Sequence, residues 1–220
     1  MSKKSFEGFN QGTLDFLKDL KDNNNREWFN HYKKDFEVHY KQPASEFSAE
    51  LSLALTGLTA QLNIPKVFRI YRDVRFSKDK TPYNAHLHIS FTPDVAGATP
   101  PMWFFGVDSA RLSLGCGIFG FDRAHLEQFR SRIVGSEGSQ IFQTIENLKS
   151  SGARFIDPEL KRVPAGYAKD HEFGHLLRHK GLSGWYDYRP DMITRSDLVN
   201  WCLEEFQKLL PLYEVLLQRK

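Results

Sequence analysis

Cysteine is scarce in this sequence of 220 residues, which contains only Cys116 and Cys202. Two cysteines can form neither a disulfide framework nor a cysteine-based zinc cluster. The sequence also lacks any stretch of about 18 apolar residues, the length that a membrane-spanning helix requires. No apolar segment follows Lys3 and Lys4 near the N-terminus, so a signal peptide is not expected. These absences predict a cytoplasmic protein with reduced thiols and no membrane partner.

A large excess of charge of one sign is also absent. The formal net charge is +3, with 30 Lys and Arg residues against 27 Asp and Glu residues. This excess is too small to indicate nucleic-acid binding by itself, so nucleic acid is not the favoured partner. The hydrophobic content of 40% is typical of a globular chain, and the length fits a single domain spanning residues 1–220. These bulk properties leave the oligomeric state open.

Hydrophobic periodicity divides the chain into helices, then strands, then helices again. Three helical segments precede the strands, with Thr13 and Asn25 as expected N-caps and Pro43 in the first turn of the third helix. Alternation with period two then predicts strands at residues 68–76, 87–91, 102–107 and 111–119. Helical spacing returns after Asp122, which is the expected cap of the next helix, and an edge strand is expected at residues 185–188.

The last helix is expected to begin near Thr194. Thr194 and Asp197 match a capping box, and Pro211 is expected to kink or end this helix. A run of helices, a run of strands and a second run of helices predict the α+β class. We therefore expect an antiparallel or mixed central sheet of about four to six strands, flanked by N-terminal and C-terminal helices.

The most distinctive segment runs from Val67 to Phe91 and is predicted to be a basic strand–loop–strand. Its local charge of +3 equals the formal charge of the whole chain. If the two strands pair as a hairpin, both apolar faces meet the core and both polar faces coincide. The coinciding polar side chains would be those of Arg69, Tyr71, Asp73, Arg75, His86, His88 and Ser90. The same alternation places Arg72 on the apolar face, where it needs a carboxylate, a ligand or a bulge that shifts the register.

Guanidinium, ammonium and imidazole groups that converge on one surface are typical of an anion site. The leading hypothesis is therefore binding of an anionic or phosphorylated small ligand at this strand–loop–strand. The predicted ligand-binding residues are Arg69, Tyr71, Arg72, Arg75, Lys78, Lys80 and Tyr83. As catalytic candidates, Asp73 would orient an arginine or act as a base, and His86 or His88 would shuttle protons near neutral pH. The alternative is a solvated surface on which these charges pair with one another.

A second hypothesis rests on His171, Glu172 and His175, which match the pattern H-E-x-x-H. On a helix the two histidines share a face and bind zinc, while the glutamate acts as the general base of a zinc-dependent hydrolase. A short helix is expected near residues 170–177, but Gly174 weakens it. The third histidine of the extended pattern is also missing. The favoured prediction is therefore no metal site, and no cofactor is implied.

The third hypothesis is a non-catalytic module that binds RNA or a protein. Tyr71, Phe76 and Tyr83 are interleaved with the basic residues and could stack on bases. Gly115 and Gly117 lie on the polar side of their strand, where a backbone or a ligand could approach closely. These residues do not decide between an enzyme and a binding module.

Four segments resemble one family of bacterial and fungal conserved hypothetical proteins, called domain of unknown function 2461. They are residues 24–29 (NNREWF), 71–83 (YRDVRFSKDKTPY), 115–117 (GCG) and 163–167 (VPAGY). The resemblance extends over nearly the whole chain, and its most specific part is the second segment. It implies one domain of this length but no established activity, cofactor or partner. In that family proline is expected more often than glutamate after the position of His171, which makes Glu172 a local variation and weakens the zinc hypothesis.

Overall fold

The computed structural model describes residues 5–95 and 99–217, so Lys3 and Lys4 lie outside the described part. The fold is α+β, as predicted, and its strands form one antiparallel sheet. The strands are β1 (Asn63–Val67), β2 (His86–Pro93), β3 (Met102–Asp108), β4 (Leu112–Ile118), β5 (Arg154–Phe155) and β6 (Leu182–Tyr188). Their order across the sheet is β1-β2-β3-β4-β6-β5.

Helices come before and after the main run of strands. The first group consists of α1 (Gln11–Asp22), α2 (Arg26–His31), α3 (Lys33–Asp35), the π-helical turn η1 (Phe36–Lys41) and α4 (Gln42–Thr59). The later group consists of α5 (Arg123–Val134), α6 (Gly138–Ser150), α7 (Gly174–Leu177), the 3-10 helix η2 (Pro190–Thr194), α8 (Leu198–Lys208) and α9 (Leu210–Leu216). Among the described residues, no helix is both long enough and apolar enough to cross a membrane.

Capping side chains and prolines place several helix starts where the sequence predicts them. The Asn25 side chain accepts a hydrogen bond of 2.9 Å from a backbone N–H in the first turn of α2, and Asp122 does the same for α5. Such a cap stabilises a helix by about 1 kcal/mol. Pro43 lies in the first turn of α4, and Pro211 lies in the first turn of α9, directly after α8 ends.

Two helix starts differ from the prediction. α1 begins before Thr13, and the buried Thr13 hydroxyl donates to the backbone oxygen of His39 at 2.6 Å. α8 begins at Leu198, while the Thr194 hydroxyl donates to the backbone oxygen of Asp191 at 2.9 Å inside η2. Both threonine hydroxyls bond to a carbonyl instead of a helix N–H, so neither forms the expected cap.

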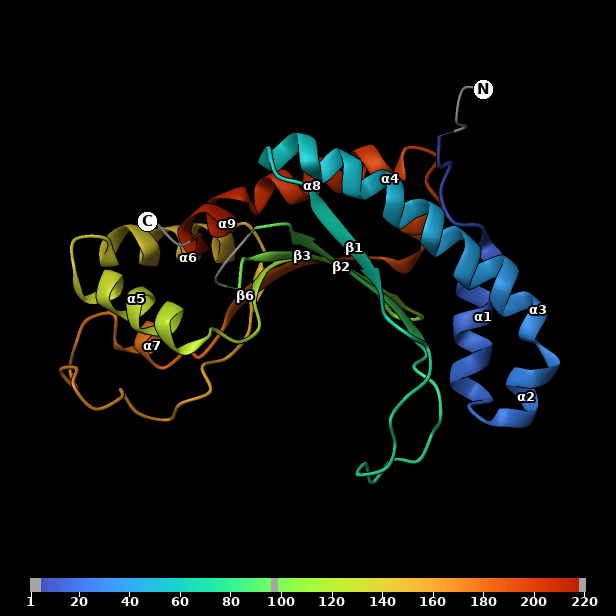
Figure 1. Cartoon of the computed structure of the whole chain (residues 1–220), viewed down its shortest axis with the longest axis horizontal. Helices are drawn as coiled ribbons and strands as arrows, with labels where there is room; N and C mark the ends of the chain where they lie inside the picture. The colour runs from blue at the N-terminus through green and yellow to red at the C-terminus, as the bar shows by residue number, and fades with distance from the viewer. Residues whose placement is uncertain (1–4, 96–98, 218–220) are drawn as a thin grey trace.

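One face of the sheet is covered by α4, α8 and α9, as Figure 1 shows from the side. The strand residues that point to this face are buried and lie opposite one another in the strand register. They are Leu87, Ile89, Phe91, Trp103, Phe105, Val107, Leu112, Leu114, Cys116 and Ile118. Burial of one large side chain of this kind stabilises the fold by about 1.5–3 kcal/mol, so this face fixes the register of the sheet.

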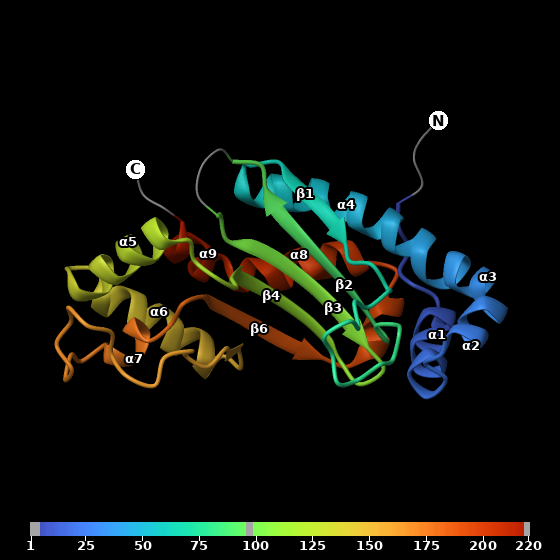
Figure 2. The ribbon, with the colours of Figure 1, turned by 60° about the horizontal axis from the view of Figure 1, so that its bottom comes forward.

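The opposite face of the sheet is open within the described part of the chain. Figure 2 shows its strands in front of α4 and α8. Helices α1–α3 stand at one end of the sheet and α5–α7 at the other, and neither group crosses the open face (Figures 1 and 2). Of the side chains that alternate with the core residues, His88 is exposed, whereas Ser90, Phe104 and Trp185 are buried by their neighbours on the open face.

The predicted strand at residues 68–76 is wrong. β1 ends at Val67, and residues 68–85 form a long excursion, here called the hairpin loop. Its two arms meet in an isolated bridge between Tyr71 and Tyr83. The loop leaves the sheet on the side of the open face (Figure 1). The polar residues of its first arm therefore do not pair with β2, and the predicted coincidence of polar strand faces does not occur.

In place of residues 68–76, β2 pairs with β1 on that side and with β3 on the other, and the alternation pattern did not reveal β1. Pro65 interrupts its pattern, and a proline is tolerated there because β1 forms an edge of the sheet. The predicted edge strand at residues 185–188 also needs correction. It is the end of β6, which lies between β4 and β5, because the two residues of β5 pair with it from outside.

Asn24 and Phe29 anchor the hairpin loop to the helices. The Asn24 amide donates to the backbone oxygen of Tyr83 at 2.9 Å and accepts from the Tyr83 N–H at 3.0 Å. The Phe29 ring stacks on Tyr83 with ring centroids 4.1 Å apart, and Tyr71 meets Phe29 in an edge contact at 5.7 Å. Two of the segments that carry the family resemblance are therefore in direct contact.

We expect Asn24→Ala to lower the free energy of unfolding by about 1–3 kcal/mol, because two partly buried backbone groups of Tyr83 lose their partner. Chemical denaturation measures this loss. Trypsin should also cleave faster after Lys78 and Lys80, since the loop loses its anchor. The control is Asn23→Ala, whose exposed side chain bonds only to the preceding helical turn. Equal proteolysis of the two variants would contradict the anchoring role.

Candidate functional site

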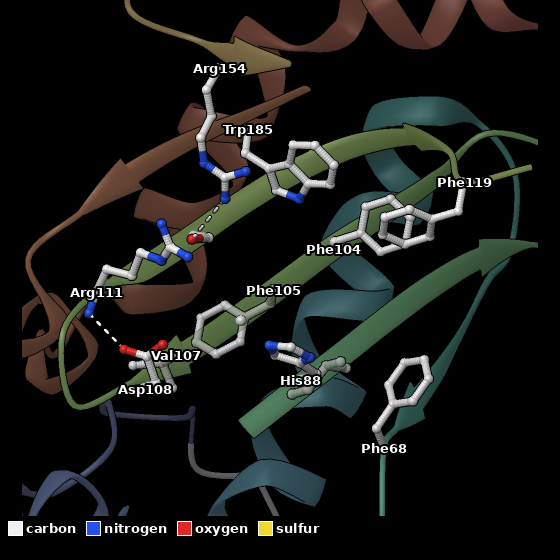
Figure 3. A pocket seen from close by; sticks show the side chains of 13 residues that line it. Phe68, His88, Phe104, Phe105, Val107, Asp108, Arg111, Phe119, Arg154 and Trp185 are labelled. Atoms are coloured by element: carbon white, nitrogen blue, oxygen red, sulfur yellow. Dashed lines mark hydrogen bonds between the residues drawn. The ribbon is translucent and has the colours of Figure 1, made fainter. Parts of the chain in front are cut away.

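Two rows of side chains cross the open face, because residues directly opposite in antiparallel strands point to the same side. One row consists of Lys66, Ser90, Phe104, Gly115, Trp185 and Arg154. The neighbouring row consists of His88, Gly106, Ser113 and Asp187. Each row contains a glycine, and a cavity of about 380 Å³ lies over them (Figure 3). This cavity is the candidate site.

The two glycines allow flat rings to lie against the sheet. A Cβ atom at Gly115 would lie 2.1 Å from Cδ1 of Trp185, and one at Gly106 would lie 2.9 Å from Cδ2 of His88. Both distances are shorter than van der Waals contact, so a side chain at either position would displace the ring. The close approach expected at Gly115 is therefore made by the chain's own indole.

Aromatic side chains form one wall of the cavity. The ring centroids of Phe104 and Phe119 are 4.5 Å apart, and those of Phe119 and Trp185 are 5.9 Å apart. The guanidinium group of Arg154 lies over the Trp185 ring at 4.8 Å. Phe119 is 55% exposed and Phe68, at the far side of the cavity, is 44% exposed. Flat apolar groups can stack on such a surface.

Arginine side chains supply positive charge at one edge of the cavity. Arg154 binds the Asp187 carboxylate through two hydrogen bonds, of 2.5 Å from Nε and 3.2 Å from Nη2. Arg111 reaches the same edge, but its Nη1 lies 3.9 Å from Asp187 and its side chain is 57% exposed (Figure 3). Asp108 binds the backbone N–H groups of Ala110 and Arg111. Arg111 is therefore the loosely paired cation of the cavity.

The pKa of Asp187 reflects this arrangement. Partial burial raises it, but the hydrogen bonds from Arg154 and Ser113 and the charges of Arg154 and Arg111 have the larger combined effect. The pKa consequently lies below its ordinary value, and Asp187 is a carboxylate at neutral pH. Arg154 and Asp187 thus act as a fixed ion pair beneath the ligand space.

His86 and His88 lie at the other edge of the cavity, with His88 in its lining. Their rings stack with centroids 3.8 Å apart. Although His88 is accessible from the cavity, partial desolvation lowers its pKa to about 4, and repulsion from His86 contributes in the same direction. Desolvation also lowers the pKa of His86. Both imidazoles are therefore neutral at physiological pH and can accept or donate a hydrogen bond.

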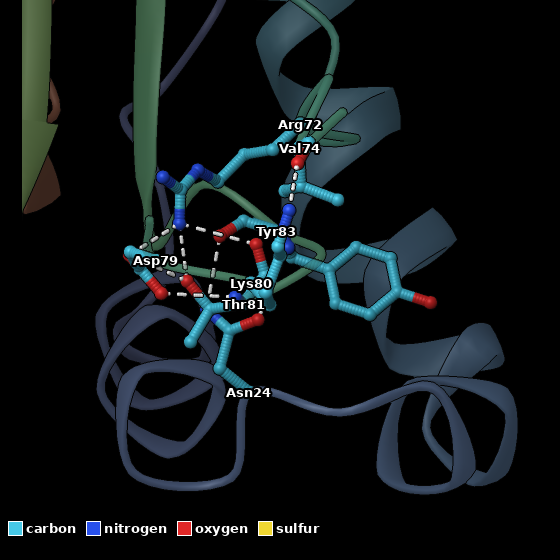
Figure 4. A network of polar contacts seen from close by, with 7 residues as sticks. All are labelled: Asn24, Arg72, Val74, Asp79, Lys80, Thr81 and Tyr83. Carbon is cyan, nitrogen blue, oxygen red and sulfur yellow. Dashed lines mark hydrogen bonds and ion pairs between the residues drawn. The ribbon is translucent and has the colours of Figure 1, made fainter. Parts of the chain in front are cut away.

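Arg72 links the two arms of the hairpin loop through hydrogen bonds to Asp79 and Thr81, as Figure 4 shows. Arg72 Nη1 donates to Oδ2 of Asp79 at 2.6 Å and to the backbone oxygen of Thr81 at 3.1 Å. Asp79 also accepts the Thr81 N–H at 2.9 Å. This backbone contact, followed by the Arg72 contact, lowers the pKa of Asp79 to about 2. The arginine that alternation placed on an apolar face therefore has its carboxylate in the loop.

Other residues predicted to bind a ligand are also engaged within the loop. Arg75 pairs with Asp73 at 2.7 Å, and Lys80 Nζ donates to the backbone oxygen of Val74 at 3.0 Å. The Arg75 contact lowers the pKa of Asp73. Arg69 and Lys78 are exposed, Tyr71 is half-exposed and Tyr83 is buried. The sequence predicted that Asp73 lies beside His86 and His88. In the structure Asp73 lies in the hairpin loop, and the residue opposite His86 in the sheet is Asp108.

The H-E-x-x-H residues do not share a helix. α7 begins at Gly174, and the Nδ1 atom of His171 accepts the backbone N–H of Phe173 at 3.1 Å. Within the described ranges, no group of three His, Cys, Asp or Glu side chains could hold a metal ion. The helical geometry on which the zinc hypothesis depends is therefore wrong for His171 and His175.

These features define an α+β protein whose antiparallel sheet keeps one accessible face with an aromatic and charged cavity. The model of one family, described as conserved hypothetical protein (DUF2461), matches residues 12–214. The chain therefore belongs to this family, as its four segments indicated. None of the curated proteins matches the sequence.

Sequence reasoning missed Arg111, Arg154 and Trp185. Trp185 and Arg154 lie opposite each other only because β6 pairs with β5. These two strands are far apart in the sequence, and neither shows a clear alternation of apolar and polar residues. One signal was present, because Ser113, Gly115 and Gly117 are all small on the side of β4 away from the core. A row of small residues on one strand face indicates that something bulky from a neighbouring strand lies across it.

We expect the His88 ring to titrate with a midpoint near pH 4, well below that of an unperturbed histidine. NMR spectra of protein labelled with ¹³C-histidine measure the midpoint. His86→Asn should raise the midpoint, because it removes the neighbouring charge that opposes protonation of His88. A His88 midpoint at or above 6.5 in the unmodified protein would show that the cavity floor is fully hydrated.

Proposed function

We propose that this protein binds a small ligand that combines a flat ring with one anionic group, in the cavity on the open sheet face. The observation that carries the proposal is the presence of the exposed Phe119 ring and the exposed Arg111 guanidinium in the lining of one cavity, next to Trp185. Phe119 is 55% exposed and offers a free ring surface, whereas Arg111 is held only by a loose ion pair of 3.9 Å with Asp187. The sequence also predicted an anionic ligand, but it placed the ligand at the strand–loop–strand. The site proposed here is the neighbouring cavity on the open face.

The size and lining of the cavity support a small molecule. Small-molecule sites in proteins commonly have volumes of about 300–1,000 Å³, with a mostly apolar lining and a few polar groups. The cavity here has about 380 Å³ and is lined by Phe68, Phe104, Phe119 and Trp185 together with a few polar residues. A single aromatic ring system with one substituent fits this space.

Two arginines and two aspartates lie at this edge, so it is the placement of the charges, and not their sum, that supports one anionic group on the ligand. Asp187 offsets Arg154 through two hydrogen bonds, and Asp108 is held by the backbone N–H groups of its own turn. Arg111 remains to bind a carboxylate or phosphate, for which guanidinium is well suited. Neutral His88 can bind a polar group of the ring from the other side of the cavity.

The proposal includes a cytosolic location. Cys116 and Cys202 are both buried as free thiols. Burial raises the pKa of each thiol, which makes them unreactive packing groups. Reduced, buried cysteines are typical of proteins in reducing compartments.

We expect nucleoside monophosphates or simple aromatic acids to quench tryptophan fluorescence and to bind at least about tenfold more tightly than their uncharged counterparts. Arg111→Gln should abolish this preference, because it removes the cation but leaves the ring surface. Titration of each probe followed by fluorescence measures both effects.

The matched control is Arg123→Gln, which makes the same substitution at a side chain that is 93% exposed. Arg123 pairs with Glu127 on α5 and does not line the cavity. If no probe of either kind bound, or if both variants changed binding equally, the proposed function would be incorrect.

A second candidate function, binding of single-stranded RNA, is favoured by Phe76. This side chain is 96% exposed at the tip of the hairpin loop, and the Arg75 guanidinium lies 5.9 Å from its ring. An exposed aromatic ring beside basic side chains is the arrangement with which proteins stack and neutralise single strands. The internal bonds of Arg72 and Lys80 hold the loop in shape behind this tip.

For this candidate, a fluorescently labelled RNA of 12 nucleotides should bind with an affinity that falls as salt rises. Phe76→Ser should weaken binding about tenfold, since loss of one stacking ring commonly costs about 1–3 kcal/mol. Leu53→Ser removes another exposed apolar side chain, on α4, and should leave binding unchanged. Binding that is insensitive to both salt and Phe76→Ser would exclude this function.

A further inference from the structure

A second depression, here called the basic cradle, lies between α7 and the irregular segment that precedes it. It has a volume of about 680 Å³ and lies outside the cavity on the open sheet face. Its charged lining consists of Lys161, Arg162, Lys169, Arg178 and Glu172, together with His171 and His175. Four cations therefore converge on one depression that contains a single carboxylate.

The backbone of the basic cradle is held by hydrogen bonds at both ends. The Leu160 N–H donates to the Arg178 oxygen at 3.1 Å, and the Lys180 N–H donates to the Glu159 carboxylate at 2.7 Å. The Gly174 N–H donates to the His171 oxygen at 2.8 Å. These bonds tie the segment before α7 to the residues after it. The cations are thus presented by an ordered backbone, which lowers the entropy lost on binding.

The four cations are not paired with protein carboxylates. None of them forms an ion pair or a side-chain hydrogen bond with another described residue. Elsewhere, Arg132, Arg154 and Arg195 each bind a carboxylate within 3.0 Å. Like charges around one depression repel one another, so this cluster raises the energy of the empty protein and favours an anion.

His171 adds a directed donor to the same lining. Its Nδ1 atom accepts the Phe173 N–H, so the ring proton of the neutral form lies on Nε2. His175 packs its ring edge against Phe142 at 5.6 Å, which fixes its position. Of the H-E-x-x-H residues, His171 thus contributes an Nε2–H donor to the cationic depression, His175 a fixed ring, and Glu172 its one carboxylate.

We propose that the basic cradle binds a small molecule through a multiply charged phosphate chain, such as a diphosphate or triphosphate group. Arg162 and Arg178 would bind phosphate oxygens through paired N–H donors, while Lys161 and Lys169 would neutralise further charge. Three or four cations match the charge of such a chain. This site goes beyond the proposed ligand of the sheet cavity, where one loosely paired cation matches one anionic group.

Isothermal titration calorimetry with inorganic phosphate, pyrophosphate and tripolyphosphate, at constant ionic strength, tests the proposal. Affinity should increase along this series, because each added phosphate meets another cation. The double variant Arg162→Gln and Arg178→Gln should weaken tripolyphosphate binding at least about tenfold. Lys169→Gln, at an exposed position where folding is not at risk, should cause a smaller loss.

The matched control is the double variant Arg123→Gln and Arg189→Gln, which removes the same net charge at side chains that are 93% and 80% exposed. It should bind tripolyphosphate as the unmodified protein does. Absence of saturable heat, or equal losses in the two double variants, would overturn the proposal.

Discussion

One-sided burial of the sheet is the constraint on which the rest of the structure depends. Because α4, α8 and α9 cover a single face, strands β2, β3 and β4 place their core side chains on that face. The alternate positions then point to the open side, where the strand register aligns them into rows. Those rows contain Gly106 and Gly115, so the ring of His88 and the indole of Trp185 lie flat on the sheet. The cavity is thus a consequence of core packing combined with two glycines.

The hairpin loop shows how a charge-rich motif can hold its own backbone in shape. Arg72, Asp79 and Thr81 form a closed set of hydrogen bonds, and Asn24 attaches the loop to the helices. Individual exposed ion pairs contribute little to stability, but a connected set can hold a loop in one shape. What this rigid loop presents to solvent is the ring of Phe76. The motif therefore acts as a frame that leaves the Phe76 ring exposed at the tip of the loop.

Sequence patterns predicted the elements that depend on local interactions. Asn25 and Asp122 cap their helices because a cap needs only three or four consecutive residues, and β4 was recognisable from its alternating core side chains. The patterns failed where distant partners decide the structure. β1 was not predicted because Pro65 interrupts its pattern, and a proline is tolerated there only because β1 is an edge strand. Trp185 and Arg154 were not predicted as neighbours because they meet only through the pairing of β5 with β6. A single sequence shows neither the edge nor the pairing, so the cavity could not be predicted from it.

The two cationic sites differ in a way that follows from charge compensation. In the sheet cavity Arg154 donates two hydrogen bonds to Asp187. The guanidinium of Arg111, at the rim, is held only loosely. In the basic cradle Glu172 is the one carboxylate in a lining with four cations, and none of these cations forms an ion pair within the described residues. A site with compensated charge gains little from a highly charged ligand, because its own carboxylate repels the extra charge. An uncompensated cluster gains with each added negative charge. The two proposed sites would therefore favour ligands of different charge.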